Sequence, residues 1–306
     1  MEKKMEREKL MNEPVVYIDG RFRPKSMAKI SVYDHGLLYG DGVFEGIRAY
    51  NGIVFKLKEH IDRLYQSAHT IMLEIPLTKE KLIADVIRTL RINVFKNAYI
   101  RLIVTRGVGD LGLDPRKCQR PTIIIIAEPA IRLVGGEEAK EKGITTIISW
   151  VKRDPVDATT HEVKSLNYLN SILAKLEANI AGVDEAIMLS SQGFVSEGVG
   201  ENIFEVKEGK IFTPPISAGI LPGLTRKKIM ELAEKLGYQI MERDITPNEL
   251  FTAEEVFLTG TAAEILPVRE VNKRVIGEGI PGPITKRLME EFEKIREDPS
   301  EGIPIY

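Results

Sequence analysis

The sequence has a single cysteine, Cys118, among its 306 residues. One thiol cannot form an internal disulfide or a Cys-rich metal site, and so little cysteine fits a reducing compartment. The few histidines share no spacing with other metal ligands, so we predict no metal site. They are His35, His60, His69 and His161.

Charge of neither sign is in excess, and long apolar runs are missing. Lys and Arg number 43 against 45 Asp and Glu, a formal net charge of −2 at pH 7, which is too balanced for a binder of nucleic acid or anionic membranes. No apolar run approaches the roughly 20 residues of a membrane span. Residues 1–13 are charged throughout and lack the apolar core of a signal peptide. We therefore predict a cytoplasmic protein whose partner is a small molecule.

What is present is the composition of a folded protein, with 43% hydrophobic and 29% charged residues. We predict two α+β domains: an N-terminal arm at 1–13, a small domain at 14–127, an interdomain loop at 128–138 and a larger domain at 139–306. The loop is placed where Pro129 and Gly135-Gly136 interrupt the periodicity.

Local patterns supply the elements of these domains. Asp19-Gly20 and Asn51-Gly52 are typical of tight hairpin turns, because both turn residues need positive φ. Alternating or continuous apolar runs predict strands, among them 15–18, 99–105, 123–126, 144–151, 186–189, 203–206, 210–213 and 256–258. Apolar residues at helical spacing predict helices in four stretches, near 61–72, 169–180, 229–236 and 284–295.

Arg101 is the first candidate for chemistry. Period two in the strand at 99–105 places Tyr99 and Arg101 on one face with apolar neighbours. Arg101 is either a strand arginine whose head reaches solvent past an apolar edge, or a receptor for a carboxylate or phosphate, which a planar guanidinium suits. The pattern alone leaves both open.

Three glycine-containing segments are further candidates. In 194–204, glycines flank Glu197 and Glu201 just before an apolar strand, which fits either close approach to a ligand or a surface loop with solvated acids. The run Leu221-Pro222-Gly223-Leu224-Thr225-Arg226 opens a helix and is either an anion site or an ordinary N-cap by Thr225. The run 259–264 ends a strand and is expected to open a helical turn, a weaker signal for a second group of free amides.

Lys164 stands just ahead of a predicted helix, and from the residue alone it reads as a solvated lysine. Its neighbours change that reading, because the chain combines motifs in a specific order. They are Tyr39-Gly40-Asp41-Gly42-Val43-Phe44-Glu45-Gly46-Ile47-Arg48, His60-Ile61-Asp62-Arg63-Leu64, Lys164 with Asn167-Tyr168-Leu169-Asn170, Ser196-Glu197-Gly198 with Gly200-Glu201-Asn202, the run at 221–226 and Gly260-Thr261-Ala262-Ala263-Glu264.

From about Val15 to the last predicted helix, these motifs resemble the fold type IV pyridoxal-phosphate enzymes, and among them the branched-chain amino acid aminotransferases. The resemblance implies the two-domain α+β fold of the D-amino acid aminotransferase type, with pyridoxal 5'-phosphate in a cleft between the domains. It implies transamination between the branched-chain L-amino acids Leu, Ile and Val and 2-oxoglutarate. D-amino acid aminotransferase and aminodeoxychorismate lyase share the fold and stay as alternatives, with a non-catalytic ligand-binding protein as a remote one.

The resemblance also assigns roles. Lys164 would be the catalytic residue, forming the Schiff base and then moving a proton at the substrate Cα. Glu197, preferred over Glu201, would face the pyridine nitrogen. Arg63 would complete the phosphate site, although a helical wheel places it opposite the Ile61/Tyr65 stripe and so in solvent. The cofactor-binding residues would be Arg63, Lys164, Tyr168, Glu197, Leu221, Gly223, Leu224, Thr225, Gly260 and Thr261.

The substrate pocket implied by the resemblance needs an apolar wall together with carboxylate receptors. Its residues would be Tyr39, Phe44, Gly46, Tyr99, Arg101, Thr261 and Ala262, with Tyr168 contributing to the wall. Tyr39 would come from a partner subunit, and the loop 107–115 would cover the neighbour's site. A homo-oligomer with at least a dimer is therefore expected, binding amino acids and 2-oxo acids, with no nucleic acid and no membrane.

Overall fold

The computed structural model describes residues 13–129, 134–136 and 138–306. The predicted N-terminal arm thus lies outside the described residues except for Glu13, whose carboxylate accepts hydrogen bonds from Ser26. The contacts divide the chain into two compact units. The first comprises Met1–Ile131, Val163–Asn167 and Arg296–Tyr306, and the second Arg132–Glu162 and Tyr168–Ile295.

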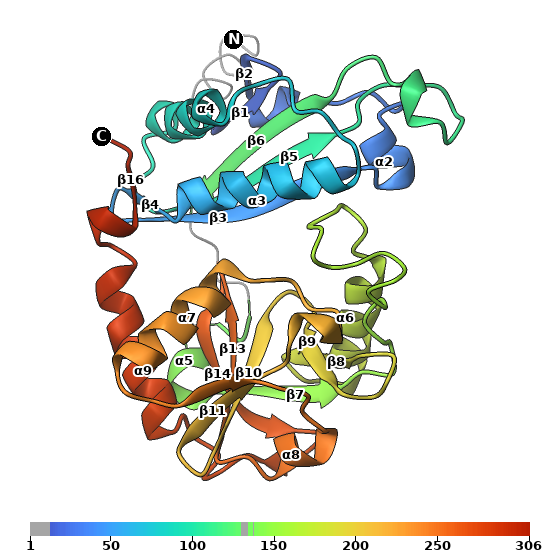
Figure 1. Ribbon diagram of the computed structural model, residues 1–306. Helices are drawn as coiled ribbons and strands as arrows, with labels where there is room; N and C mark the ends of the chain where they lie inside the picture. Colours follow the sequence, from blue (N-terminus) through green and yellow to red (C-terminus); the bar gives the residue numbers. More distant parts are fainter. Residues whose placement is uncertain (1–12, 130–133, 137) are drawn as a thin grey trace, which may run out of the picture. The chain divides into compact units, whose positions relative to one another are not determined.

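The first unit is built on a seven-stranded sheet of order β16-β4-β3-β5-β6-β1-β2 (Figure 1). Its strands all pair antiparallel. Helices α3 and α4 pack on β3 and β6 and bury a shared apolar core. The elements are β1 (Val15–Ile18), β2 (Arg21–Pro24), η1 (Lys25–Met27), α2 (His35–Tyr39), β3 (Gly42–Tyr50), β4 (Ile53–Phe55), α3 (Leu57–Thr70), α4 (Lys79–Ile92), β5 (Ala98–Thr105), η2 (Pro115–Lys117), β6 (Thr122–Pro129), η4 (Pro299–Glu301) and β16 (Gly302–Pro304).

The second unit has a mixed nine-stranded sheet of order β12-β11-β10-β13-β14-β7-β8-β9, with β15 beside β14. The β14–β7, β7–β8 and β11–β12 pairs are parallel. Helices α7 and α9 pack on β13, and α6 packs on β8. The elements are α5 (Ala139–Lys142), β7 (Ile144–Ile148), α6 (Leu169–Ala181), β8 (Glu185–Leu189), β9 (Val195–Gly198), β10 (Asn202–Lys207), β11 (Lys210–Thr213), η3 (Ile216–Ala218), α7 (Leu224–Lys235), β12 (Ile240–Glu242), α8 (Pro247–Phe251), β13 (Glu255–Gly260), β14 (Glu264–Val271), β15 (Arg274–Val275) and α9 (Pro283–Ile295).

Both predicted hairpin turns are confirmed. Asp19 and Gly20 have φ of 47° and 84°, and Asn51 and Gly52 have φ of 45° and 89°. Positive φ at both central residues matches the right-handed twist of the flanking strands. These turns join β1 to β2 and β3 to β4.

The division into units differs from the contiguous domains expected from the sequence. The sequence pattern places residues 163–167 and 296–306 in the second domain, but they group with the first unit. The reason is backbone pairing: Ser165 forms a bridge with Val43 on β3, and β16 pairs with β4. Backbone pairing with the first sheet, and not position in the sequence, thus decides to which unit these two segments belong.

Helix α6 is confirmed, but the apolar residues that predicted it are exposed. Ile180 is 87% exposed and Leu169 67%, and Ile172, Leu173 and Leu176 are also classed as exposed. The side that packs on the sheet carries small residues instead, namely Ser171, Ala174 and Ala178. Small side chains let the helix axis approach β8 closely, which leaves the large apolar residues on the opposite side.

The helical turn expected after residue 259 is wrong. Strand β13 runs to Gly260 and β14 begins at Glu264, so the intervening residues form a hairpin turn. Met72, placed on the stripe of the first predicted helix, lies beyond the end of α3 and is 88% exposed.

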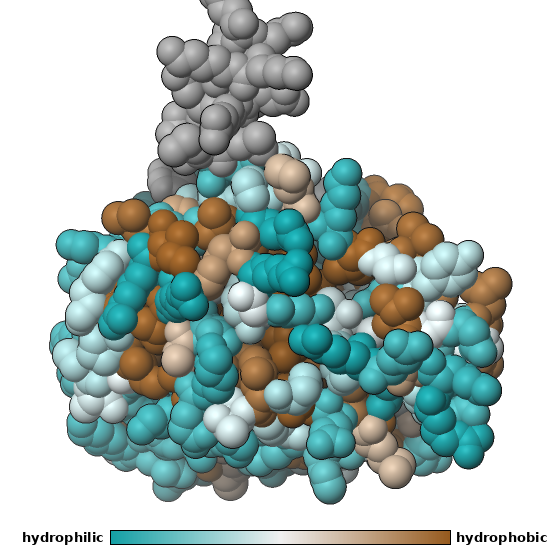
Figure 2. Space-filling model, turned by 90° about the horizontal axis from the view of Figure 1, so that it is seen from above, coloured by the Kyte–Doolittle hydropathy of each residue, from teal (hydrophilic) through white to brown (hydrophobic). Residues whose placement is uncertain are grey.

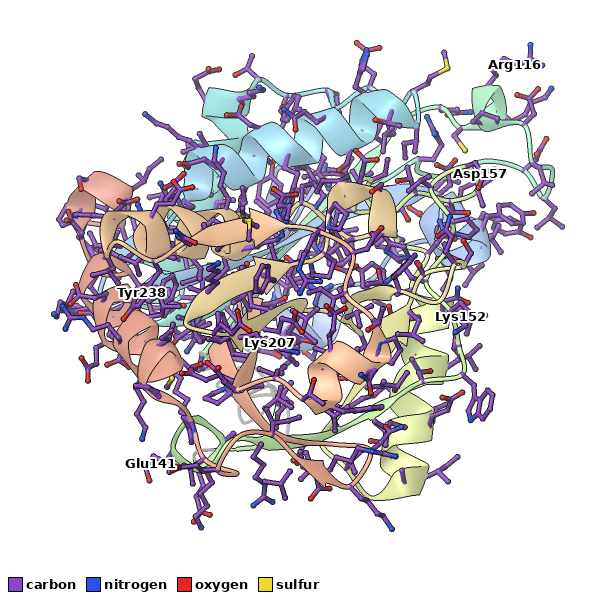
Figure 3. All side chains as sticks on the ribbon, turned by 60° about the horizontal axis from the view of Figure 1, so that its bottom comes forward. Arg116, Glu141, Lys152, Asp157, Lys207 and Tyr238 are labelled. Atoms are coloured by element: carbon purple, nitrogen blue, oxygen red, sulfur yellow. The ribbon has the colours of Figure 1, made fainter. Side chains whose placement is uncertain are left out.

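Polar side chains cover most of the face shown in Figure 2, with apolar ones scattered between them. In Figure 3, Arg116 and Glu141 lie at the edge of the view, and the Arg116 side chain is 87% exposed. Within the described residues, no helix combines the length and the apolar character that crossing a membrane requires.

Candidate active site

One group of candidate residues forms a patch on strands β3 and β5 of the first unit. These strands pair with Gly46 opposite Arg101 and Phe44 opposite Ile103. Directly opposed residues in an antiparallel pair share a face, so Phe44, Gly46, Tyr99 and Arg101 lie together. The other face carries Ile100 and Leu102, which are fully buried in the core.

Arg101 is held against aromatic rings on this patch. Its guanidinium carbon lies 4.5 Å from the centroid of the Phe44 ring, and its Nη2 donates a hydrogen bond of 3.0 Å to the Tyr99 hydroxyl. A Cβ on Gly46 would come within 2.3 Å of the same hydroxyl. Glycine at position 46 therefore makes room for Tyr99, which in turn orients Arg101. Arg101 itself is half-buried.

Lys164 joins the same patch from a distant part of the chain. The Phe44 amide donates to the Lys164 carbonyl at 2.9 Å, and the Lys164 amide donates to the Ser67 hydroxyl at 3.1 Å. These bonds fix the backbone at residue 164, and its Nζ lies 4.7 Å from the centroid of the Phe44 ring. The Lys164 amine and the Arg101 guanidinium thus both lie close to the Phe44 ring.

Behind this patch, Glu45 anchors a buried ion cluster. Its carboxylate accepts from Arg63 Nε at 2.7 Å and Nη2 at 2.8 Å, and it contacts His60 Nδ1 at 2.7 Å. Burial alone would raise the pKa of Glu45, but Arg63 and then His60 outweigh it and lower that pKa to about 2. Burial also lowers the pKa of His60, more than Glu45 raises it.

The expectation that Arg63 lies in solvent is wrong, since the residue is 7% exposed. The helical wheel ignored Glu45, a buried acid on β3 that draws one polar side of α3 into the core. Because Nε and Nη2 bind Glu45, a phosphate would have to be met from the far side of the guanidinium.

Tyr39 and the loop 107–115 lie next to each other in the first unit. The Tyr39 hydroxyl donates to the Leu111 carbonyl. His35 Nε2 lies 2.8 Å from the Asp110 carbonyl, and the His35 amide donates to the Gly107 carbonyl. Tyr39 therefore contacts the loop 107–115 of its own chain, and it is 37% exposed.

The second unit contains the other candidate residues, with Glu197 on β9 as their centre. Glu197 is 4% exposed, and its carboxylate is held by Arg153 Nη2 at 3.1 Å, by the Asn202 amide group at 2.9 Å and by the Leu221 backbone amide at 3.1 Å. Three donors around one carboxylate favour its anionic form.

Glu201, the competing acid, has a different environment. Burial, and after it the charge of Glu185, raises the pKa of Glu201 to about 8. Its Oε2 accepts from the Gly200 amide at 3.1 Å, and the cation near it, Lys175, is bonded to Glu185. Of the two acids, Glu197 therefore has the directly bonded cation.

The start of α7 supplies amides suited to an anion. Gly223 is the N-cap without a side-chain cap, Leu224 begins the helix, and Thr225 is 5% exposed. Capping by Thr225, the ordinary alternative, is thus not what the structure has. A Cβ on Gly223 would come within 2.0 Å of Asn202 Oδ1, so glycine is needed where Asn202 reaches Leu221 and Glu197.

The other predicted residues of the second unit lie at element ends. Tyr168 is the N-cap residue of α6, and its ring meets the His161 ring edge-on at 6.1 Å between centroids. Gly260 ends β13, and Thr261 and Ala262 form the half-buried turn that follows.

Sequence reasoning missed Arg153, Ser67 and the role of Asn202. Asn202 stood inside a quoted motif, and its contact with Glu197 five residues earlier could have been suspected from the intervening turn. Arg153 lies in a polar stretch that reads as a surface loop, and no periodic signal marks it as buried. Among the residues that the structure describes, no group of three or more His, Cys, Asp or Glu side chains could hold a metal ion.

Comparison with known proteins gives a consistent result. The family model described as amino-transferase class IV matches residues 42–271. A putative branched-chain-amino-acid aminotransferase of Methanocaldococcus jannaschii is 56% identical over 291 residues, covering 95% of this chain and 99% of that protein.

Solved structures agree with the sequence match. The branched-chain amino acid aminotransferase of Escherichia coli has a TM-score of 0.90 at 37% identity, covering 93% of this chain and 95% of that one. The enzyme of Thermobaculum terrenum, in its PLP-bound holo form, has a TM-score of 0.88 at 29% identity, covering 97% and 99%. The predicted α+β fold is thus confirmed, and the chain belongs to the class IV aminotransferases.

Proposed function

We propose that the protein transfers the amino group between branched-chain L-amino acids and 2-oxoglutarate with pyridoxal 5'-phosphate, giving branched-chain 2-oxo acids and L-glutamate. The observation that carries the proposal is the patch on which Arg101 and Lys164 both lie over the Phe44 ring. An apolar wall beside a guanidinium suits a pocket that must accept both a leucine side chain and a glutamate carboxylate. The relatives named above support this choice of substrates.

The residues present fit this cofactor by their donor chemistry. Lys164 offers a primary amine for an aldehyde, and Glu197 is a carboxylate held by three donors. The amides at Leu224 and Thr225 open a 12-residue helix, which suits a phosphate. The cofactor, when bound, supplies the electron sink for deprotonation at the substrate Cα.

The chain's own residues would then divide the work. Lys164 would hold the cofactor and, once released from it, would move the proton at the substrate Cα. Glu197 would keep the pyridine nitrogen protonated, and Tyr168 would donate a hydrogen bond near the phenolic oxygen. The phosphate would be held by one arginine, by the start of α7 and by the end of β13. These residues are Arg63, Leu221, Gly223, Leu224, Thr225, Gly260 and Thr261.

Substrate recognition falls to both polar and apolar groups. Phe44, Gly46 and Tyr168 would form the apolar wall. Tyr99, Arg101 and the amides of Thr261 and Ala262 receive carboxylates, because charge-assisted hydrogen bonds to carboxylates are the strongest polar contacts available.

We also infer that the active unit is at least a dimer in which Tyr39 and the loop 107–115 complete a neighbour's site. The support is the contact between Tyr39 and Leu111, which presents both as one surface. The five exposed apolar residues of α6 are a second surface that association would cover. Analytical ultracentrifugation tests this inference: a monomer at micromolar concentration with full activity would contradict it.

The experiment for the reaction is a spectrophotometric titration of the cofactor-loaded protein with L-leucine, L-glutamate, D-alanine and aminodeoxychorismate. Conversion to the pyridoxamine form by L-leucine and L-glutamate, but not by D-alanine, is the expected result. Conversion by D-alanine alone would indicate a D-amino acid aminotransferase. Pyruvate release from aminodeoxychorismate would indicate the lyase.

A further inference from the structure

Arg153 is one of the largest fully buried side chains in the described part of the chain, with 2% exposure. It follows β7, and its amide donates to the Leu189 carbonyl at 2.9 Å. A buried guanidinium is costly unless its donors are paired, so its partners indicate why it is there.

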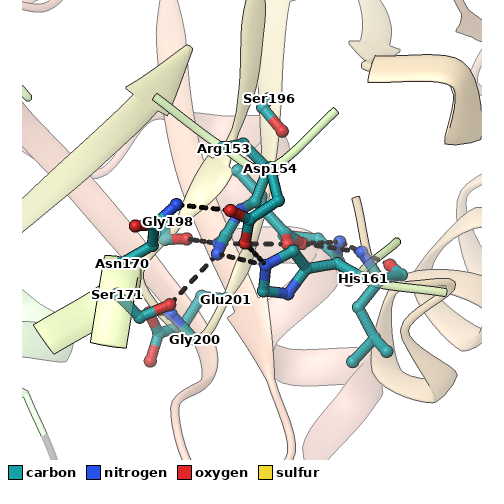
Figure 4. Close-up of polar contacts among 12 residues, drawn as sticks. Arg153, Asp154, His161, Asn170, Ser171, Ser196, Gly198, Gly200 and Glu201 are labelled. Carbon is teal, nitrogen blue, oxygen red and sulfur yellow. Dashed lines mark hydrogen bonds and ion pairs between the residues drawn. The ribbon is translucent and has the colours of Figure 1, made fainter. Parts of the chain in front are cut away.

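These partners come from β9 and α6, and Figure 4 shows Gly198 and Ser171 beside Arg153. Arg153 Nη2 lies 3.1 Å from Glu197 Oε1 and donates to the Gly198 carbonyl at 2.7 Å. Nη1 donates to the Ser171 hydroxyl on α6 at 3.0 Å. The plane of the guanidinium is thus fixed by β9 on one side and α6 on the other.

Neighbouring polar groups do not compete for this pairing. The Asp154 carboxylate is taken up by His161 Nε2 at 2.8 Å and by the Asn170 amide group at 2.6 Å. His161 Nε2 lies 3.5 Å from Arg153 Nη1, which makes it at most a weak partner. Arg153 therefore forms its ion pair with the Glu197 carboxylate.

We propose that Arg153 is a positioning residue that keeps Glu197 ionised and fixes the direction in which its carboxylate faces the cofactor's pyridine nitrogen. This rests on the proposed function. Arg153 and Asn202 bind different oxygens of Glu197, so the carboxylate plane is set from two sides. Without the positive charge of Arg153, Glu197 would keep the neutral donors of Asn202 and Leu221. A carboxylate on a residue that is 4% exposed would then gain a proton more readily, and a neutral carboxyl could not keep the pyridine nitrogen protonated.

The test uses the full-length protein loaded with cofactor that carries ¹⁵N in the pyridine ring, so that the nitrogen's chemical shift reports its protonation without turnover. Arg153→Met should shift the resonance to the unprotonated range at a pH where the parent protein stays protonated. In single-turnover reactions it should slow proton abstraction by about 10- to 100-fold, the usual cost of losing an outer partner of a functional group, and leave the KM for leucine nearly unchanged.

Arg153→Lys keeps the charge and should retain a protonated nitrogen over most of the pH range. Ser171→Ala removes an anchor of the guanidinium and should shift the titration in the same direction as Arg153→Met, by less. Arg243→Met is the matched control, because it breaks another ion pair of the same unit, with Glu205 at 2.8 Å, and should leave the nitrogen's titration unchanged.

A nitrogen titration in Arg153→Met that matches the parent protein would overturn the proposal. If that variant does not fold, Arg153→Lys and Ser171→Ala decide, and titrations of both that coincide with the parent protein would overturn it equally. A parent protein that binds cofactor with a protonated nitrogen but is not converted by leucine or glutamate would count against the proposed function. A shifted titration in Arg153→Met would support the role of Arg153 even then.

Discussion

Lys164 reaches the Phe44 ring from a segment that is only five residues long and is held by backbone hydrogen bonds to β3 and to Ser67. Because these bonds hold the residue through its backbone, Lys164→Ala should leave the fold intact and abolish turnover. Borohydride should fix the cofactor to the parent protein but not to the variant, which mass spectrometry detects. A variant that is still labelled would mean that another lysine does the work.

The environments of the two acids near β9 predict different consequences of amide substitution. Glu197→Gln should leave the cofactor attached but slow proton abstraction by orders of magnitude, because a neutral pyridine is a poorer electron sink. Glu201→Gln should do less, since the raised pKa of about 8 keeps Glu201 mostly neutral at pH 7. Single-turnover half-reactions measure both. A more damaging change at Glu201 would reverse the assignment.

Arg101 lies between the two interpretations that its sequence pattern allowed, half-buried and stacked on Phe44. Arg101→Leu should hardly disturb the fold but should cost roughly 2–5 kcal/mol of transition-state binding, or about 30- to several-thousand-fold in kcat/KM. A much larger loss for glutamate than for leucine would assign Arg101 to the side-chain carboxylate. Equal losses would assign it to the α-carboxylate, and unchanged kinetics would remove it from the site.

At the level of elements, strand β10 contains a buried acid, Glu205, that is not one of the candidate site residues. Glu205 is fully buried and pairs with Arg243 at 2.8 Å, while its Oε2 has no hydrogen-bond partner among the described residues. Burial raises the pKa of Glu205 to about 7, although Arg243 opposes it. The folded state therefore binds this proton more tightly than the unfolded state, whose carboxyl titrates at about 4.3.

Stability from this group is thus present below the unfolded pKa and is lost as pH rises toward 7. Glu205→Gln cannot ionise, so relative to the parent protein it should gain about 2 kcal/mol in free energy of unfolding between pH 5 and pH 8. Urea denaturation at both pH values measures this, with Glu208→Gln, exposed at the end of the same hairpin, as the control. An equal difference at both pH values would contradict the prediction.

Elements with strong local signals could be predicted, and contacts between distant segments could not. The Asn51-Gly52 turn depends on two adjacent residues, and it forms as expected. The burial of Arg63 depends on Glu45, which lies 18 positions away on another element, and a helical wheel contains no such information. In α6 the period was right but the buried face was not, because the close packing of Ala174 and Ala178 on the sheet is a property of two elements.

For the candidate site, the motif resemblance names residues but does not indicate what holds them. Glu197 was preferred by its place in a motif, whereas the physical reason to prefer it is the ion pair with Arg153. That arginine is distant in the sequence and lies in a stretch without periodicity. Sequence pattern identifies groups that face a ligand more readily than groups that orient them.

At the scale of the whole molecule, the last described strand belongs to the core of the first unit. β16 pairs with β4, Ile305 is fully buried, and the Ile305 carbonyl accepts from Arg91 Nε. Ile305→Ala should lower the free energy of unfolding by about 2–4 kcal/mol, as for other buried isoleucines. Tyr306→Ala, whose side chain is 62% exposed, is the control in urea denaturation. A loss below about 1 kcal/mol, too small for a buried isoleucine, would mean that β16 adds little.

This path of the chain sets an order of events during synthesis. Domains usually fold in the order in which they leave the ribosome. Here the unit that begins first is completed last, because it needs residues 163–167 and then 302–305, whereas the second unit has all its described strands by residue 275. Until translation passes β16, the edge of β4 stays unpaired, so the nascent protein exposes an open strand that a neighbouring chain on the same polysome could capture.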